Sequence, residues 1–322
     1  MTDRPAIAID LGGTSIKAGL VLGAEVLETG TIPANAEGGL AAQLPRIAAL
    51  AERLCAGRGL APADCHGIGM AVPFLVDPSR QRVRSAPRGK YADACDVDLR
   101  DWGRDRFGLS VRIENDAHAA LLGEWRHGAG QGSDDIVMLT LGTGIGCSVL
   151  IGGRPLRGRH FQAGVLGGHL IANPDGGARC AACPASGCYE AESAAQSLAR
   201  EARAHAAFPA SALAREASID FAAVFRLAAT GDAAAAAIRD RCVRYWTALV
   251  ISLVHAFDPE RVLIGGGVSE AEEVGPFLAL MQDEVTRRAW IVEPVEIRAA
   301  RLGNRAGLVG AASLFTHELQ WI

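Results

Sequence analysis

The first residues with the types and spacing for chemistry are a carboxylate and a glycine turn near the N-terminus, in Asp10-Leu-Gly-Gly-Thr-Ser-Ile-Lys17. Gly12 and Gly13 allow backbone N–H groups to approach phosphate oxygens closely. Thr14 adds a hydroxyl group, Lys17 adds a positive charge, and Asp10 can hold Mg²⁺ through water. The alternative is a tight hairpin without a ligand. The sequence contains no G-x-x-x-x-G-K-[ST], so this turn is not a P-loop.

Two further glycine turns follow apolar runs. Gly142-Thr-Gly-Ile-Gly146 superficially resembles a dinucleotide fingerprint, but strand residues follow the turn where that motif requires a helix. A second phosphate-facing hairpin therefore fits better. Gly265-Gly266-Gly267 would let the backbone pass close to an adenosine, and a plain strand–helix turn is the alternative.

Asp116 stands where a short apolar strand ends and a helical pattern begins. A carboxylate at a helix N-terminus stays ionised and can accept a proton from a sugar hydroxyl, which is a recurring part of phosphoryl transfer. The alternative is a simple N-cap. Asn115 could bind sugar hydroxyls, whereas we expect His118, inside the helix, to be a packed or surface side chain.

The metal candidates are His169, Cys180, Cys183 and Cys188. Three thiolates and an imidazole form the Cys₃His set of a closed, tetrahedral zinc site, and such a site is structural because no ligand position is open. The surrounding residues are rich in Gly, Pro and Ala, so a metal would hold together a segment with little core. The alternative is a set of free cysteines with an incidental histidine.

The elements that must position these residues follow an α/β pattern. Residues 6–20 alternate as strand, glycine turn and strand, and residues 136–151 repeat this plan, with Leu11-Gly12 recurring as Leu141-Gly142. A duplicated hairpin favours two similar lobes. Helical patterns cover 40–54, most of 191–257 including the Ala-rich stretches 202–214 and 228–238, and 307–319, the last of which could return to the first lobe.

Composition excludes several classes of protein. The 322 residues carry a formal net charge of −4, which leaves no positive excess to hold a nucleic-acid backbone. The N-terminal apolar run is too short for a signal peptide, and no run reaches the length of a membrane span. We therefore expect a cytoplasmic protein without a nucleic-acid or membrane partner, in which clustered cysteines indicate metal more than disulfide.

In combination, the motifs resemble those of the ROK family (repressors, open reading frames and kinases) over nearly the whole chain. They occur in the family's order: Asp10–Thr14, Glu114–Ala117, Leu141–Gly146, Gly168-His169 with the downstream cysteines, Gly187–Glu190 and Ile264–Gly267. The resemblance implies a duplicated actin-like, hexokinase-type ATPase fold of two lobes with a central cleft. We expect a small lobe from 1–118 and 304–322, and a large lobe from 119–303 that includes the zinc segment 165–190.

The resemblance also implies roles. Asp116 would be the catalytic base, while Asn115, His169 and Glu190 would touch the sugar, with His169 also bound to zinc. ATP, with Mg²⁺ near Asp10, would lie among the three glycine turns, which are Gly12, Gly13, Thr14 and Lys17, then Gly142, Thr143 and Gly144, then Gly265 and Gly266. A homodimer is expected by family analogy alone.

The sequence departs from the family pattern at three places, of which the first two bear on the identity of the sugar and the third on the local loop shape. The family's Glu three residues before the His is Leu166 here, a Pro-Asn pair is Pro87-Arg88, and the cysteines open as C-x-x-C instead of C-x-C. The implied function is ATP-dependent phosphorylation of a hexose such as glucose, or of an amino sugar, at C6. The alternatives are a non-catalytic sugar-binding protein and a ROK-type regulator without its DNA-binding domain, since only nine residues precede Asp10.

Overall fold

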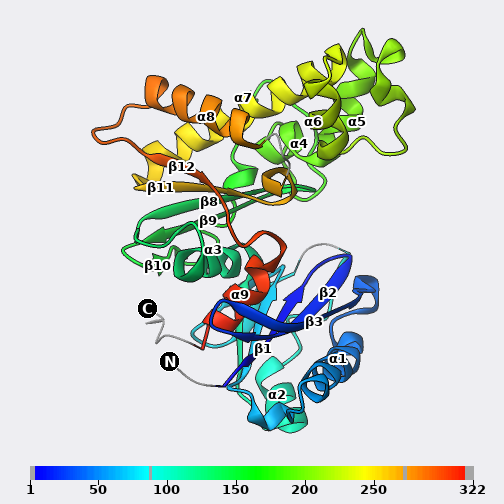
Figure 1. Cartoon of the computed structure of the whole chain (residues 1–322), viewed down its shortest axis with the longest axis vertical. Helices are drawn as coiled ribbons and strands as arrows, with labels where there is room; N and C mark the ends of the chain where they lie inside the picture. Colours follow the sequence, from blue (N-terminus) through cyan, green and yellow to red (C-terminus); the bar gives the residue numbers. More distant parts are fainter. Residues whose placement is uncertain (1–3, 87–88, 271–273, 316–322) are drawn as a thin grey trace. The chain divides into compact units, whose positions relative to one another are not determined.

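The protein is described here by a computed structural model that covers residues 4–86, 89–270 and 274–315. The chain divides into two compact units. Unit 1 contains residues 1–132, 157–163 and 304–322, and unit 2 contains residues 133–156 and 164–303. In Figure 1, unit 1 holds the blue N-terminal strands, the green helix α3 and the red helix α9, and unit 2 holds most of the remaining green to orange chain.

Each unit has one five-stranded sheet in the described part of the chain, and the two sheets have the same plan. In unit 1 the order is β3-β2-β1-β4-β7. β2 pairs antiparallel with both β1 and β3, whereas β4 pairs in parallel with β1 and β7 pairs in parallel with β4. In unit 2 the order is β10-β9-β8-β11-β12, with the same directions. The strands span β1 Ala6–Leu11, β2 Ser15–Leu22, β3 Glu25–Pro33, β4 Ile68–Val72, β7 Val111–Asn115, β8 Ile136–Leu141, β9 Ile145–Ile151, β10 Arg154–Pro155, β11 Arg261–Gly265 and β12 Glu296–Ala299.

The duplicated hairpin predicted from the sequence is confirmed by strand register. Leu11 pairs with Ile16 at the first glycine turn, and Leu141 pairs with Ile145 at the second. β1 and β8 are buried along nearly their whole length, which explains why both read as continuous apolar runs.

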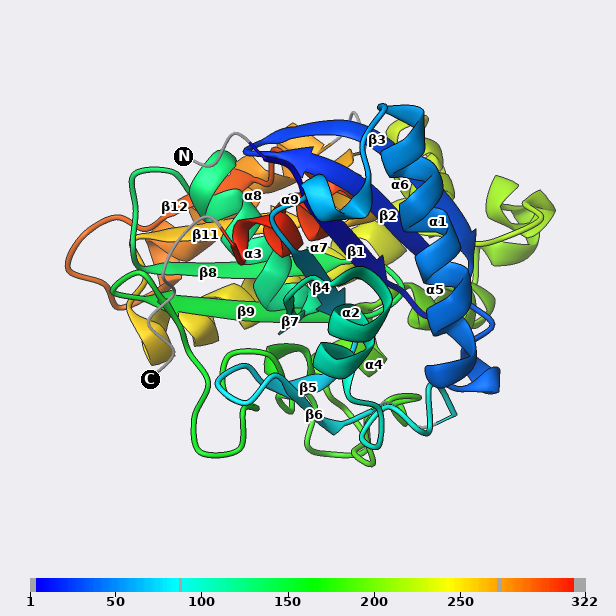
Figure 2. The same ribbon diagram turned by 90° about the horizontal axis from the view of Figure 1, so that it is seen from below.

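The remaining elements of unit 1 are helices around the sheet and a small hairpin. They are α1 Leu44–Gly57, α2 Leu99–Phe107, α3 Asp116–His127, α9 Ala306–Ser313, the hairpin β5 Leu75–Asp77 with β6 Arg82–Ser85, and the 3₁₀ turns η1 Ala36–Gly38, η2 Ala41–Gln43 and η3 Pro62–Asp64. Figure 2 shows α1 running along β2 and β3, which it contacts.

The helices of unit 2 follow β10 in the sequence: α4 to α7 come before β11, and α8 lies between β11 and β12. They are α4 Tyr189–Ser193, α5 Ala195–Ala204, α6 Phe221–Ala229, α7 Ala233–Phe257, α8 Val274–Arg288, and the 3₁₀ turns η4 Gly167–His169, η5 Phe208–Ala210, η6 Ala212–Arg215 and η7 Gly267–Glu270. The turn η8 Gly303–Arg305 lies where the chain returns to unit 1. No single helix among the described residues is long and apolar enough to span a membrane, and α6 with α7 passes that test only as a pair bent by 119°.

Helix α9 returns to unit 1, as the sequence predicted, and packs on α3, β1 and β4. Small residues allow this close approach. A Cβ atom at Gly310 would collide with the carbonyl group of Ala119 on α3. Because α3 is held by α9, the compact unit extends to residue 132, beyond the lobe boundary expected after residue 118.

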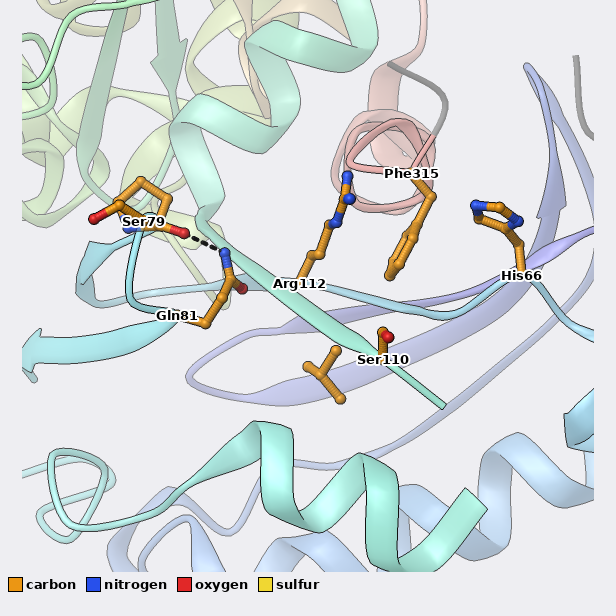
Figure 3. A pocket seen from close by; sticks show the side chains of 8 residues that line it. His66, Ser79, Gln81, Ser110, Arg112 and Phe315 are labelled. Atoms are coloured by element: carbon orange, nitrogen blue, oxygen red, sulfur yellow. Dashed lines mark hydrogen bonds between the residues drawn. The ribbon is translucent and has the colours of Figure 1, made fainter. Parts of the chain in front are cut away.

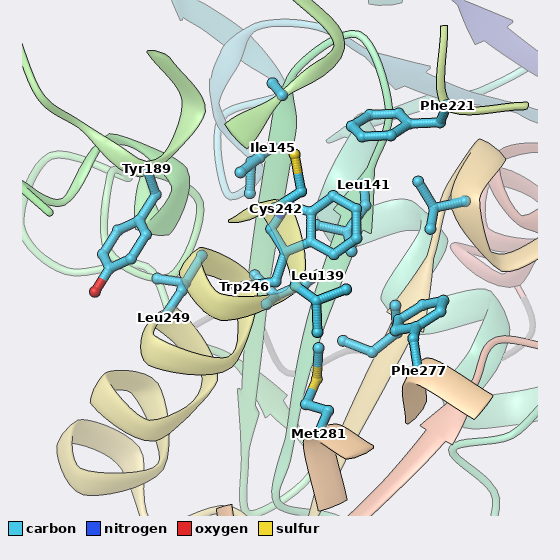
Figure 4. Packing of buried hydrophobic residues seen from close by; sticks show 14 of the residues in the cluster. Leu139, Leu141, Ile145, Tyr189, Phe221, Cys242, Trp246, Leu249, Phe277 and Met281 are labelled. Carbon is cyan, nitrogen blue, oxygen red and sulfur yellow. The ribbon is translucent and has the colours of Figure 1, made fainter. Parts of the chain in front are cut away.

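Each unit has its own apolar core. In unit 1, the β1 and β4 side chains pack with α1 and with aromatic residues such as Phe74 and Tyr91. In unit 2, Trp246 of α7 is fully buried and packs against Phe221, Phe225 and Phe277 (Figure 4). Two separate cores are the expected solution for a chain of this length.

Two of the predicted helices are shorter in the structure than the sequence indicated. The prediction of helix for the Ala-rich stretch 202–214 was wrong beyond Ala204, where α5 ends and only the 3₁₀ turns η5 and η6 follow. Pro209 has no N–H group and cannot continue an α-helix. The predicted helix over 307–319 is confirmed as far as Ser313, while residues 316–319 and the Pro87-Arg88 departure lie outside the described residues.

Candidate active site and zinc centre

The junction of β7 and α3 presents the candidate base. Asn115, not Asp116, is the N-cap of α3, because its Oδ1 atom accepts the N–H groups of Ala117 at 3.0 Å and His118 at 3.3 Å. Its Nδ2 atom donates to the carbonyl oxygen of Phe74 at 3.1 Å, and the Asn115 side chain also hydrogen-bonds to the Asp116 carboxylate. Asp116 is the first helical residue and its side chain is exposed. The capping alternative for Asp116 is therefore wrong.

Asp116 has an unusual electrostatic environment. Desolvation by the surrounding protein raises the pKa of its carboxyl group to about 6, and the neighbouring carboxylate of Asp10 adds to this shift. Water reaches the exposed side chain and screens part of the effect. The pKa of Asp10 is itself raised by burial and lowered by Lys17, which lies opposite it in the β1–β2 register. Lys17 thus compensates Asp10.

The first glycine turn is covered by residues that the sequence analysis missed. The hydroxyl group of Tyr91 donates to the carbonyl oxygen of Gly12 at 2.8 Å. A Cβ atom added to Gly13 would lie 2.6 Å from the Nζ atom of Lys90, so an ammonium group stands beside the turn. The local sequence pattern does not indicate that Tyr91 and Lys90 contact this turn, because they are separated from it by about eighty residues.

The second and third glycine turns lie at the ends of the neighbouring strands β8 and β11 in unit 2. Gly266 has a positive φ of 85° and runs against the backbone of Leu141. At the second turn, the N–H group of Ile145 donates to the Oε2 atom of Glu190 at 2.9 Å. The structure therefore brings Gly144, Gly266 and Glu190 together at one edge of this sheet.

The four predicted zinc ligands converge. Their ligand atoms all lie within 4.8 Å of one another, and the Nδ1 atom of His169 is 4.0 Å from the Sγ atoms of both Cys180 and Cys188. Tetrahedral zinc with these ligands would set such separations at about 3.7 Å, so the donor set fits the metal closely. The Nε2 atom of His169 lies on the opposite edge of the ring and can face a ligand.

The zinc segment is supported by a buried ion pair. Glu192 accepts the N–H group of Ala178 at 2.7 Å and pairs with the guanidinium group of Arg241 at 2.5 Å. Both oxygens of this nearly buried carboxylate are thus engaged. Glu190, two residues earlier, lies 3.7 Å from the Sγ atom of Cys180, which links the cysteine cluster to the second glycine turn.

A second buried cluster adjoins Asp116. Glu114 is fully buried and binds Arg157 through both carboxylate oxygens, at 3.1 and 2.6 Å. His118 is also buried, with its Nδ1 atom 3.4 Å from Glu114. The packed alternative for His118 is thus the one that the structure shows. Glu114 could have been noticed in the sequence as a charged residue within an apolar strand, but the sequence does not reveal its partner.

The predicted site residues therefore form two sets. Unit 1 brings together Asp10, Gly12, Gly13, Thr14, Lys17, Asn115 and Asp116, and unit 2 brings together Gly142, Thr143, Gly144, His169, Cys180, Cys183, Cys188, Glu190, Gly265 and Gly266. A pocket of about 340 Å³ lies elsewhere in unit 1, beside the edge strand β7, and is lined by His66, Gln81, Arg112 and Phe315 (Figure 3). It contains none of the predicted site residues.

Comparison with known proteins now decides the family. A family model described as "ROK family" matches residues 6–318. The chain belongs to the ROK family. A glucokinase of Thermotoga maritima is 34% identical, over 97% of this chain and 98% of its own length. A glucokinase of Halalkalibacterium halodurans is 32% identical, over 99% and 97%.

Solved structures of the ROK family share the fold. The structure of a ROK family glucokinase from Streptomyces griseus, in complex with glucose and AMPPNP, matches with 33% identity and a TM-score of 0.79, over 96% of this chain and 98% of that chain. The predicted family and the duplicated, two-lobed actin-like fold of the hexokinase type are thereby confirmed.

Proposed function

We propose that this protein transfers the γ-phosphoryl group of MgATP to a hydroxyl group, at C6, of a hexose such as glucose or of an amino sugar. ROK family membership, with glucokinases at 32–34% identity over nearly the whole chain, supports a sugar phosphotransferase. The observation that carries the chemistry is the exposed Asp116 carboxylate at the start of α3, beside Asp10.

Asp116 is suited to act as the general base. A base is most effective when its pKa lies near the working pH, and the pKa of Asp116 is raised to about 6 by its surroundings and by Asp10. It is therefore mostly ionised at neutral pH yet basic enough to take the hydroxyl proton as the phosphoryl group is transferred.

The remaining roles divide between the units. The N–H groups of the turns at Gly12-Gly13 and Gly142-Gly144 would bind phosphate oxygens, and Gly265-Gly266 would allow the nucleotide close to the backbone. Mg²⁺, when bound near Asp10, would neutralise phosphate charge. Thr14 and Lys17 add a hydroxyl and a charge to the first turn.

The sugar would be held by Asn115, His169 and Glu190. The amide group of Asn115 lies beside the Asp116 carboxylate, and the Nδ1 atom of His169 faces the cysteines, which directs Nε2 toward a hydroxyl. Glu190 already accepts from Ile145 and lies near Cys180, so it can contact a hydroxyl only with its remaining lone pairs. Zinc, when bound by His169 and the three cysteines, would fix the orientation of this histidine.

The decisive experiment measures ADP release from MgATP with glucose, mannose, allose, fructose, N-acetylglucosamine and N-acetylmannosamine. We expect sugar-dependent release that Asp116→Asn reduces by at least about 100-fold, the contribution of a positioned base. If none of these sugars causes ADP release from folded and zinc-loaded protein, the proposed kinase function is overturned. A thermal shift with a sugar in that case would indicate a non-catalytic sugar-binding protein.

A further inference from the structure

No step of the proposed reaction uses the buried cluster of Glu114, His118 and Arg157. The Arg157 side chain is only 12% exposed and that of Glu114 is fully buried. Burying both ions is costly unless geometry and hydrogen bonds compensate, and a bidentate pair does so most effectively. Glu114 stays ionised, since Arg157 and His118 outweigh the effect of burial and lower its pKa to about 2.

The cluster is bonded directly to the backbone that presents Asp116. The Oε1 atom of Glu114 accepts the N–H group of Asn115 at 2.8 Å, while the same atom faces the Nδ1 atom of His118 in the first turn of α3. A displacement of this carboxylate would therefore move the end of β7 and the start of α3 together.

Arg157 reaches the cluster from an unusual place in the chain. Residues 157–163 belong to unit 1, whereas the residues before Arg157 and after Ala163 belong to unit 2. The N–H group of Ala163 donates to the carbonyl oxygen of Arg157 at 3.0 Å, which closes the loop on itself. The pair with Glu114 thus attaches this loop to the junction that carries Asp116.

We propose that Arg157 is a positioning residue for phosphoryl transfer, which fixes the β7–α3 junction, and with it Asp116, through its bidentate ion pair with Glu114. This inference rests on the proposed kinase function. Positioning accounts for much of the catalysis of phosphoryl transfer, and a small displacement of a catalytic group can cost roughly 100-fold in rate.

The charges around Asp116 make the inference testable by pH. Asp10 of β1, with Lys17 of β2 opposite it, Glu114 of β7, His118 of α3 and Arg157 are charged or titratable groups at this junction. β7 also carries Arg112, and β5, which packs on β7, carries Asp77, whereas α9 (Ala306–Ser313) contributes no such group. Glu114→Gln keeps the shape of the side chain but leaves the arginine charge uncompensated. A nearby cation favours the ionised form of Asp116, so its pKa should fall by about 0.5–1 unit.

The experiment compares the wild type with Arg157→Met, Arg157→Lys and Glu114→Gln, and uses Arg159→Met, an exposed arginine of the same loop, as the matched control. We expect Arg157→Met to lower kcat roughly 100-fold with both KM values within about twofold, Arg157→Lys to recover part of kcat, and Arg159→Met to have wild-type kinetics. In an Asp116→Asn background, Arg157→Met should cause no further loss, because it acts only through Asp116.

Other outcomes would overturn the proposal: an equal loss with Arg159→Met, a full further loss in the Asp116→Asn background, or an unchanged pH profile in Glu114→Gln. If Arg157→Met does not fold, Arg157→Lys and Glu114→Gln decide the question alone. A ¹³C NMR titration of the Asp116 carboxyl group requires no activity. Hence an inactive wild type would refute the kinase function, whereas an unshifted titration in Glu114→Gln would refute the role of the ion pair.

Discussion

The carboxylate of Glu190 accepts a hydrogen bond from the backbone N–H group of Ile145 at 2.9 Å. Ile145 begins β9 directly after the second glycine turn, and Glu190 lies in α4, two residues after the zinc candidate Cys188. The bond therefore joins the turn proposed to bind phosphate to the segment proposed to bind sugar and zinc. A substitution in the glycine turn should therefore alter sugar binding, and a substitution in the zinc segment should alter the turn.

Gly144→Ala should test this joint. A Cβ atom at Gly144 would lie 2.5 Å from the Oε2 atom of Glu190, so the carboxylate must move. We expect KM for the sugar to rise roughly tenfold, the effect of losing one good hydrogen bond to a charged group. Gly142→Ala is the matched control, because a Cβ atom there meets nothing within 4 Å. An equal sugar KM in both variants would contradict the proposed link.

The pH dependence of kcat/KM should report Asp116. A base must be deprotonated, and its pKa is raised to about 6 by its surroundings and by Asp10. We expect kcat/KM to be constant above about pH 7 and to fall about tenfold per unit below pH 6. Asp10→Asn removes a neighbouring negative charge, so it should shift this limb to lower pH. A limb that stays in place would show that Asp10 does not act on the base.

Zinc should be present at about one ion per chain and should be lost at low pH. Burial raises the pKa of the Cys188 thiol to about 12, so metal binding must displace protons from the thiols. A chelator should speed hydrogen exchange in segment 165–190 and lower activity. Cys188→Ser should reduce zinc content, while Cys95→Ser, an exposed cysteine outside the cluster, should not. Less than about half a zinc per chain in carefully purified protein would count against the site.

Arg241→Met should destabilise unit 2. It leaves the buried carboxylate of Glu192 without its cation, and the loss of one partner of a buried pair costs about 3–5 kcal/mol in the free energy of unfolding. Arg239→Met, on the same helix, breaks only a pair with the exposed Asp240 and should cost less than about 1 kcal/mol. Chemical denaturation measures the free energy of unfolding of both variants. Similar losses of stability would show that burial of the Glu192 pair adds nothing to its contribution.

Leu166→Glu should improve turnover of glucose. Leu166 is 39% exposed, three residues before His169, at the position where the ROK pattern has a glutamate. A carboxylate there could accept bonds from the C1 or C2 hydroxyl, and we expect kcat/KM for glucose to rise roughly tenfold. Leu170→Glu, at a neighbouring exposed leucine, is the control. An unchanged kcat/KM for glucose would show that another residue sets selectivity.

Local patterns in the sequence determined much of this protein. The two hairpins, their duplication, the strand–helix junction at Asp116 and the Cys₃His set follow from periodicity and spacing, which depend on neighbouring residues. The Ala-rich stretch 202–214 shows the limit, because high helix propensity could not overcome Pro209 and the N-cap Ser211.

Only the tertiary structure decided the contacts between distant segments. Glu114 meets Arg157, Glu190 meets Ile145, and Tyr91 meets Gly12 through hydrogen bonds across 43, 45 and 79 residues. Such pairs leave no periodic trace in the sequence, since two of them join a side chain to a backbone group and the third joins two charged side chains far apart in the chain. Burial makes them necessary: a charge or donor removed from water must find a partner, and the packing of the fold selects which one.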